Sequence, residues 1–545
     1  MSNFAPRFDT KMESKWDFKS WCPFVTIIGF AVVCFCFFQF LYPYHFFFKG
    51  QNQLFLMSWS YVNTLFAKPA WMACLAGEFL TQFYEYDVAG AAILTLSLTL
   101  LFVLAYKVLD SLLKNKWIVL SVALVLTMRE ASCHLSYAYT LSSTFALIGG
   151  LLMFLVLRRV VALRWSWALM AVLAGMLSGY WLFGYGVWAF LLLSAFVAWK
   201  VAVPVAIALA CLMPLVRSHY NLTTTGLYKY PGLESLHAPD FNRETDLHMI
   251  HSYEVGDWDD VIKTATSDKV LDAFRVNGHP QVRLSQDAQV SSTVRRFIYN
   301  LVQAQRGNLP DVLLEFYPNY LGTFTSMIGT NIPMLMFMNL HEFYFAIGDI
   351  ARAERGAFMA SVSVPSNRNA YCVKRLAECA LVRDDQKATD KFIGLLRQTI
   401  PYSDWAENAA HDDRYRQKAQ YINLQDTISP SEESCDIMSQ LVKSNPQNVV
   451  ALDYLLCSQL LKKDIDSFKR DYDLYCTEHP RIKKLYQEAL CIWLMKNNAG
   501  QEEWQKYIKD DQVKDRLKEY MAEKGSLRFA DTYWFYFDVF NLGGH

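Results

Sequence analysis

Two groups of polar residues interrupt the apolar first half of this 545-residue chain, and both contain residue types that can do chemistry. The first group lies between Tyr42 and Asp87, in a stretch too polar to span a bilayer and too apolar for an ordinary loop. Glu78 and Gln82 stand four residues apart within it, which places them on one face of a helix. We expect one or two short amphipathic helices on the outer membrane face, with Glu78 as a candidate catalytic acid or base and Gln82 as a candidate binding residue.

Arg129, Glu130 and His134 form the second group, at the end of a short apolar run. An ionisable side chain at membrane depth is costly and often functional, so all three are candidate binding residues. Adjacent residues on a helix do not face one another, so Arg129 and Glu130 each require a different partner. The alternative to a substrate-binding role is anchoring in the headgroup region or a structural ion pair, and we favour this alternative.

Long apolar runs must position both groups. Cys22–Leu41 has the length and apolarity of a membrane-spanning helix. Further runs follow at 88–106, 117–128, 139–157 and 165–183. The block 185–215 is too long for one span, and we expect Lys200 and Pro204 to divide it into two short ones. The sequence therefore predicts about seven spans.

The basic residues orient these spans. Several of them precede the first span. The others follow alternate later spans, at Lys107, Lys114, Lys116, Arg158, Arg159, Arg164 and Lys200. Because cytoplasmic loops carry an excess of Lys and Arg, seven spans place the N-terminus in the cytoplasm and the C-terminal part outside it. If 185–215 forms one tilted helix instead, the C-terminal part stays inside.

The charge distribution changes near Arg217. Residues 1–217 contain 15 Lys and Arg against 8 Asp and Glu, whereas the remainder contains 37 against 44. The second part has the charge density of a soluble domain, and no clustered basic face indicates a nucleic-acid partner. We expect a transmembrane domain over 1–217, a linker over 218–240 and a soluble domain over 241–545.

Helical periodicity is frequent in the second part and strand patterns are scarce, which predicts an all-α protein. A short polar turn between two apolar helices recurs in the segments that begin at Val255, Ile347, Val382 and Lys462. Their spacing is typical of helix-hairpin repeats, of which the tetratricopeptide class is the nearest. Each hairpin must stack on its neighbours to bury its apolar stripe. The sequence therefore predicts a TPR-like helical-repeat domain that binds protein or peptide partners.

No strong metal or cofactor motif occurs in the sequence. His248, His251 and Glu254 could share a helix face and bind a metal, but a polar helix surface is the more common explanation. The twelve cysteines contain no CxxC pair, and their even number permits disulfides as well as free thiols in helix cores. We expect no resident metal or cofactor.

Three segments carry a resemblance to known proteins. Lys49–Gln53, Glu78–Phe83 and Val88–Ala92, followed by membrane spans and a TPR-like tail, resemble an uncharacterised family of bacterial polytopic membrane proteins over nearly the whole chain. More remotely, the architecture resembles the GT-C glycosyltransferases. This second resemblance implies a sugar taken from a lipid phosphate carrier and a catalytic acid early in the first outer loop. The chain departs from that pattern, because the first acid of its loop is Glu78, far along it.

Two functional hypotheses follow. The first is a scaffold anchored in a bacterial inner membrane, whose TPR-like tail binds protein partners in envelope assembly or transport. The second is a GT-C-like glycosyltransferase with a lipid-linked sugar donor, in which Glu78 is the base or contacts a divalent metal and Arg129 and His134 contact phosphate. We favour the scaffold. A transporter or channel is disfavoured because the spans contain almost no charged residues.

Overall fold

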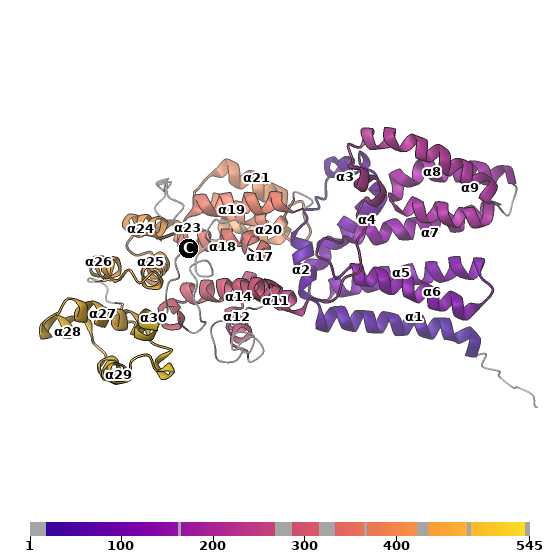
Figure 1. Ribbon diagram of the computed structural model, residues 1–545. Helices are drawn as coiled ribbons and strands as arrows, with labels where there is room; N and C mark the ends of the chain where they lie inside the picture. The colour runs from indigo at the N-terminus through magenta and orange to yellow at the C-terminus, as the bar shows by residue number, and fades with distance from the viewer. Residues whose placement is uncertain are drawn as a thin grey trace, which may run out of the picture. The chain divides into compact units, whose positions relative to one another are not determined.

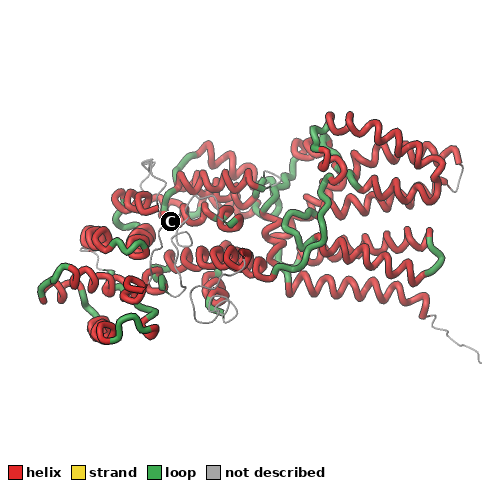
Figure 2. Tube along the Cα trace, viewed as in Figure 1, coloured by secondary structure: helices red, strands yellow, loops and turns green. Residues whose placement is uncertain are grey.

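Helices make up the regular structure of this protein. The structure is a computed structural model and describes residues 18–161, 165–267, 286–314, 333–364, 368–421, 434–476 and 481–539. No strand occurs in these ranges, which confirms the all-α prediction for them (Figure 1, Figure 2). The chain divides into two compact units. The bundle unit comprises the described residues within 1–43 and 59–239, and the tail unit comprises those within 44–58 and 240–545.

The bundle unit consists of long apolar helices, with four short helical segments between the first and second of them. In chain order it contains α1 (Phe18–Cys36), the π-helical turn η1 (Phe37–Leu41), α3 (Trp59–Phe66), α4 (Trp71–Thr81), the 3-10 turn η2 (Gln82–Glu85), α5 (Ala89–Leu112), α6 (Lys116–Cys133), α7 (Leu141–Val161), α8 (Trp165–Phe183), α9 (Gly186–His219) and α10 (Thr224–Lys229). Neighbouring long helices pack side by side: α1 and α6 on α5, and α5, α8 and α9 on α7 (Figure 1).

Within the described ranges, three helical stretches are long and apolar enough to cross a membrane by length and composition. They are Cys22–Leu41, Ala89–Leu112 and Leu141–Val160. The first is mostly exposed to its surroundings and carries apolar side chains there, such as Val33, which is 70% exposed. In water such a surface would be unfavourable, whereas lipid accommodates it. These three helices therefore indicate association with a membrane.

The block that the sequence divides at Lys200 and Pro204 is one helical run, α9, of 34 residues. The ring of Tyr180 lies 6.5 Å from the ring of Trp188 near the start of α9, and 6.4 Å from the ring of Tyr220 just past its end. A straight helix of this length would hold its ends about 50 Å apart, so α9 turns back on itself. Helix is assigned across Lys200 and Pro204, so no loop separates the two short spans that the sequence predicts; a proline removes one backbone hydrogen bond without requiring a loop. The chain nevertheless reverses direction inside this run.

The two ends of the bundle unit differ in character. At one end, the backbone N–H of Ala70 donates to the carbonyl of Tyr180, and that of Tyr185 donates to the carbonyl of Tyr230 at 2.8 Å. We call this the closed end. The opposite end contains the turn from α5 into α6 with Lys114 and Lys116, and we call it the basic end.

The tail unit is a succession of shorter helices in which neighbours in sequence pack on one another, for example α18 to α21 and α24 to α27. Its helices are α2 (Tyr44–Gln51), α11 (Phe241–Glu254), α12 (Trp258–Ala265), α14 (Gln286–Gln305), α15 (Leu309–Val312), α17 (Met334–Met338), α18 (Leu340–Ile347), α19 (Ile350–Ser363), α20 (Ala370–Val382), α21 (Gln386–Leu396), α22 (Ser403–Asn408), η4 (Ala409–His411), α23 (Asp413–Tyr421), α24 (Ser434–Ser444), α25 (Val449–Leu461), α26 (Ile465–Cys476), α27 (Lys484–Lys496), α28 (Gln501–Tyr507), α29 (Asp511–Ala522), η5 (Leu527–Phe529) and α30 (Tyr533–Val539).

Six turns between tail helices share one backbone geometry. In each, a residue with positive φ follows a helix, and the N–H of the next residue donates to the carbonyl five positions earlier, as in a Schellman motif. The positive-φ residues are Gly256, Gly307, Gly348, Asp384, Lys463 and Asn498. In four of these turns the next residue is an aspartate whose carboxylate accepts an N–H in the first turn of the following helix: Asp257, Asp349, Asp385 and Asp464. These are the four turns that the sequence marks, so their helix-turn-helix geometry is confirmed.

The stretch Tyr42–Asp87 contains α2, α3, α4 and η2, more helices than expected, and α2 lies in the tail unit. Helix α2 belongs to the tail unit because the carboxylate of Glu244, in α11, accepts the backbone N–H groups of Tyr44 and His45 at the start of α2. These N–H groups have no partner within their own helix, so a buried carboxylate stabilises them. The predicted linker 218–240 contains α10, and its residues up to Pro239 belong to the bundle unit.

Candidate functional site

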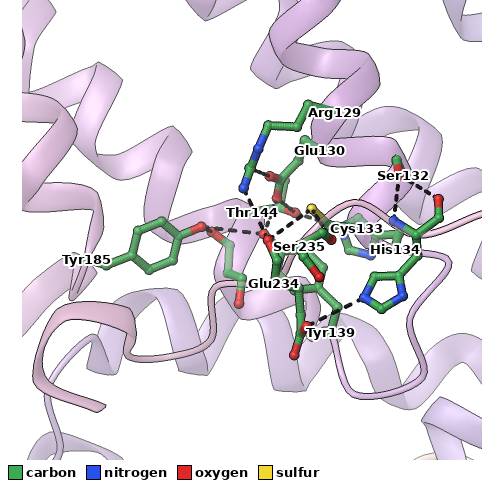
Figure 3. A network of polar contacts seen from close by, with 12 residues as sticks. Arg129, Glu130, Ser132, Cys133, His134, Tyr139, Thr144, Tyr185, Glu234 and Ser235 are labelled. Atoms are coloured by element: carbon green, nitrogen blue, oxygen red, sulfur yellow. Dashed lines mark hydrogen bonds and ion pairs between the residues drawn. The ribbon is translucent and has the colours of Figure 1, made fainter. Parts of the chain in front are cut away.

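The second polar group lies at the closed end of the bundle unit, where α6 ends and α7 and α9 begin (Figure 3). Arg129 and Glu130 lie near the C-terminal end of α6. The short connection to α7 returns the chain, so that Tyr139 and Thr144 lie against that end. The site is therefore built from two helix ends and the connection between them.

Glu130 is 1% exposed and accepts two short hydrogen bonds. The hydroxyl of Tyr139 donates to its Oε1 at 2.6 Å, and the hydroxyl of Thr144 donates to the same atom at 2.7 Å. Oε2 lies 3.8 Å from Nη1 of Arg129 and has no hydrogen-bond partner among the described residues. A buried carboxylate is tolerated only where donors or charges compensate it. Glu130 thus joins the end of α6 to the start of α7.

The hydroxyl of Tyr139 lies beside Tyr185 at the start of α9. It lies 3.5 Å from the hydroxyl of Tyr185, which donates to the backbone carbonyl of Ser143 at 2.8 Å. Each of the two hydroxyl hydrogens is thus used in a hydrogen bond, to Glu130 or to Ser143.

A close approach of α7 and α9 makes the Tyr185 contact possible. A Cβ atom on Gly186 would lie 1.8 Å from the carbonyl oxygen of Ala146, and one on Gly150 would lie 2.2 Å from the carbonyl oxygen of Gly186. No larger residue fits at either position, and small residues of this kind allow helix backbones to meet. Tyr185, one residue before α9, is thereby held against the first turn of α7.

His134 contacts the same threonine as Glu130. Its Nε2 lies 2.7 Å from Oγ1 of Thr144. Thr144 has one hydroxyl hydrogen and donates it to Glu130. Nε2 of His134 must therefore carry a proton and donate to Thr144, which orders the network from His134 through Thr144 to Glu130.

Residues 234–237, which we call the strap, form hydrogen bonds with the C-terminal part of α6. Arg129 Nη2 donates to the carbonyl of Glu234 at 3.1 Å. Ser132 Oγ donates to the carbonyl of His237 at 2.7 Å, and the His237 N–H donates back to Ser132 Oγ at 3.1 Å. Arg129 and Glu130 thus have different principal partners, as their adjacency on a helix requires.

Glu78 and Gln82, the first polar group, also lie in the bundle unit, in α4 and at the start of η2. Glu78 is half-buried and accepts the hydroxyl of Tyr61 at 2.5 Å. Gln82 is 4% exposed and donates to the carbonyl of Phe79 at 2.9 Å. The hydrogen bonds described above unite Arg129, Glu130 and His134 in one network and leave Glu78 and Gln82 outside it.

The chemistry that this network permits is limited by its burial. Glu130, His134, Tyr139 and Thr144 are each at most 2% exposed, so a substrate could reach them only if the helices moved apart. Sequence analysis did not identify Tyr139, Thr144, Tyr185 or the strap as partners of the predicted site residues. One sequence pattern could have indicated the partners of Glu130. Several residues with hydroxyl groups stand at the start of α7, shortly after a charged pair in an apolar context.

A metal site finds no support at His248 and His251. Their rings stack on those of Tyr44 and Phe47, at 4.2 and 3.8 Å, and Nε2 of His248 lies 2.7 Å from Oδ2 of Asp260. The two imidazoles therefore hold α2 against α11. Among the described residues, no group of three or more His, Cys, Asp or Glu could hold a metal ion, and all twelve cysteines are free thiols.

Comparison with known proteins gives one match. A protein-family model described as a family of unknown function (DUF6057) matches residues 19–237 and 195–539. No curated protein and no solved structure shows significant similarity to the chain. Since the two matched segments together extend over nearly the whole sequence, the chain belongs to the uncharacterised DUF6057 family.

Proposed function

We propose that this protein is a membrane-anchored scaffold whose TPR-like tail unit binds a protein partner in envelope assembly or transport. The burial of Glu130 carries the proposal. Its carboxylate is 1% exposed and is bound by Tyr139 and Thr144, so the most conspicuous ionisable group of the bundle unit holds helices together. The bundle unit then serves as an anchor, and the tail unit presents the functional surface.

The geometry of the tail unit supports the repeat character. Six Schellman turns join its helices, and helices adjacent in sequence pack on one another. Stacked helix pairs of this kind form extended surfaces suited to protein or peptide partners.

An apolar patch on α19 supports a protein as the partner. Phe358, Met359 and Val362 are 46%, 47% and 60% exposed and lie on adjacent turns of this helix. Contiguous exposed apolar side chains mark interaction sites more often than isolated ones do. Arg355 is also exposed and precedes Met359 by one turn. The patch suits a protein segment that combines apolar side chains with carboxylates.

We further infer seven crossings of a bacterial inner membrane, with a cytoplasmic N-terminus and an extracytoplasmic tail unit. The reversal inside α9 supports the count, because it makes two crossings of one helical run. The orientation is supported by the basic residues at the ends of α5 and α7, at the start of α6 and midway along α9. They are Lys107, Lys114, Lys116, Arg158, Arg159 and Lys200.

Photo-crosslinking in the full-length protein tests the scaffold. A photoreactive residue at Val362 is expected to yield one discrete crosslinked protein in cells, and the Met359→Glu substitution should abolish that product by placing a charge in the patch. The matched control is a photoreactive residue at Lys518 of α29, which is 78% exposed in a charged surface and should yield no such product. No crosslink from Val362, or the same product from Lys518, would count against the proposal.

The glycosyltransferase with a lipid-linked sugar donor is the second candidate. It has one observation in its favour: Glu78 is half-buried and so, unlike Glu130, is accessible from solvent. Glu78 would act as the base or contact a divalent metal. If this candidate is right, Glu78→Gln alters a lipid-linked or surface glycan while the protein stays abundant, and Asp87→Asn, a nearby exposed carboxylate, leaves the glycan unchanged. An unaltered glycan in Glu78→Gln eliminates the candidate.

A further inference from the structure

We propose that the basic end of the bundle unit binds the phosphate headgroup of an anionic phospholipid. A cavity of about 520 Å³ opens there, between the start of α1 and the turn from α5 into α6. Its lining includes Lys114, Lys116 and Trp117 at the rim and Cys22 and Leu120 below. The inference does not depend on the scaffold proposal.

The two lysines give the cavity its charge. Lys114 and Lys116 are exposed, neither pairs with a carboxylate of a described residue, and no acidic residue is among the residues that line the cavity. Asn115 between them has another role, since its side chain accepts the N–H groups of Trp117 and Ile118 at 3.0 and 3.4 Å. The ammonium groups, not the start of α6, are therefore the groups available to an anion.

The lower wall of the cavity suits acyl chains. Cys22 and Leu120 belong to the apolar core that α1, α5 and α6 share. Both helices that border the cavity also expose apolar side chains along their length. These are Phe24, Val25, Ile28, Val32 and Val33 on α1, and Ile118, Val122, Val125 and Leu126 on α6. A free phosphate would need only the lysines, whereas a phospholipid would occupy both the charged rim and the apolar faces.

Trp117 fits the same occupant. Its indole is 53% exposed beside the two lysines, at the start of α6. Tryptophan side chains favour the headgroup level of a bilayer, with the apolar body toward the acyl chains. The cavity thus lies at the depth where a lipid phosphate would meet the ammonium groups.

Native mass spectrometry of the full-length protein in detergent, titrated with phosphatidylglycerol or phosphatidylcholine, tests the proposal. We expect phosphatidylglycerol to bind preferentially, and the Lys114→Gln/Lys116→Gln double substitution to weaken its binding about tenfold or more. Lys107→Gln is the matched control, because this exposed lysine of α5 lies outside the cavity lining and should bind lipid as the wild type does.

Three results would overturn the site. Equal binding of both lipids by the wild type would show that the lysines do not select an anionic headgroup. Equal weakening in Lys107→Gln would mean that the lipid responds only to overall charge. Displacement of phosphatidylglycerol by inorganic phosphate at the same concentration would assign the lysines to a free anion. An unchanged melting temperature of the double variant without added lipid separates lost binding from lost folding.

Discussion

The carboxylate of Glu130 takes both of its hydrogen bonds from hydroxyl groups, although Arg129 stands next to it in the sequence. Hydroxyl donors are short, and they can be buried without bringing a second charge out of water. The arginine is left to bind the strap at Glu234. The division of partners suits a network whose task is to hold three helices and a connecting segment in one arrangement.

Removal of the Glu130 carboxylate should destabilise the bundle unit. Glu130→Ala leaves the buried hydroxyls of Tyr139 and Thr144 without their acceptor, for which we expect a loss of about 2–4 kcal/mol in the free energy of unfolding. Glu130→Gln keeps an acceptor oxygen and should cost about 1 kcal/mol. Reversible unfolding of the full-length protein in detergent measures both. If Thr144→Val costs the same in the Glu130→Ala background as in the wild type, the two residues are not coupled and the network is refuted.

Glu488 in the tail unit predicts a pH dependence. It accepts the N–H of Tyr533 at 2.7 Å, and burial raises its pKa from 4.5 to about 7. The folded protein therefore binds more protons than the unfolded one between these values, so the free energy of unfolding should fall as pH rises through that window, by at most about 3 kcal/mol. Glu488→Gln should flatten this slope, whereas Glu502→Gln, on the surface of α28, should leave it intact. Chemical unfolding at a series of pH values is the measurement, and a slope of opposite sign would contradict the assignment.

Individual candidate residues were predictable where their charge contrasts with an apolar context. Arg129, Glu130 and His134 stand out for that reason, and the structure unites them. Their partners were not predictable, because tyrosine and threonine are ordinary residues at membrane helix ends. The strap lies 105 residues further along the chain from Arg129, and only packing brings it there. Local spacing also paired Glu78 with Gln82, although α4 ends at Thr81 and Gln82 begins a 3-10 turn.

The recurrent element of the tail unit is a Schellman turn whose last residue caps the next helix. One short segment thus ends a helix, reverses the chain and starts the following helix. Gly-Asp and similar pairs carry this information locally, so four turns were predictable from sequence. The turns at Gly307 and Asn498 were not, since asparagine and alanine replace the capping aspartate after them.

Two Gly→Ala substitutions, one in a turn and one inside a helix, should change the free energy of unfolding of the tail unit in opposite directions. Gly348 has φ 87°, a conformation that a Cβ atom disfavours, so Gly348→Ala should lower the free energy of unfolding of the tail unit by about 1 kcal/mol. Gly394 lies inside α21, and a Cβ atom added there would have no neighbouring atom within 4 Å, so Gly394→Ala should raise it by up to about 1 kcal/mol. Urea unfolding of the full-length protein followed by tryptophan fluorescence gives both values. Effects of the same sign would argue against the turn geometry.

At the scale of the whole molecule, the proposed side of the membrane for the tail unit depends on the reversal inside α9. Composition predicted a division near Lys200 and Pro204, but it could not predict that helix is assigned to the whole run. The contacts of Tyr180 with both ends of the run are tertiary and have no local signal.

Reporter fusions test this path. A topology reporter fused after residue 200 is expected on the cytoplasmic side, and one fused after residue 225 on the opposite side, because the proposed topology makes the second part of α9 a separate crossing. Activity of both fusions on the same side would mean that α9 crosses once, and it would move the tail unit to the cytoplasm.

The hydrogen bonds between Glu244 and the start of α2 join two segments that are synthesised at different times. Residues 44–58 emerge from the ribosome before most of the bundle unit, whereas their partner helix α11 begins only at Phe241. At about 5–20 residues per second, α2 waits on the order of ten seconds or longer for its partner. During that interval the aromatic side chains of α2 must be shielded from water. The tail unit also needs residues 44–58, so residues 240–545 alone cannot complete it.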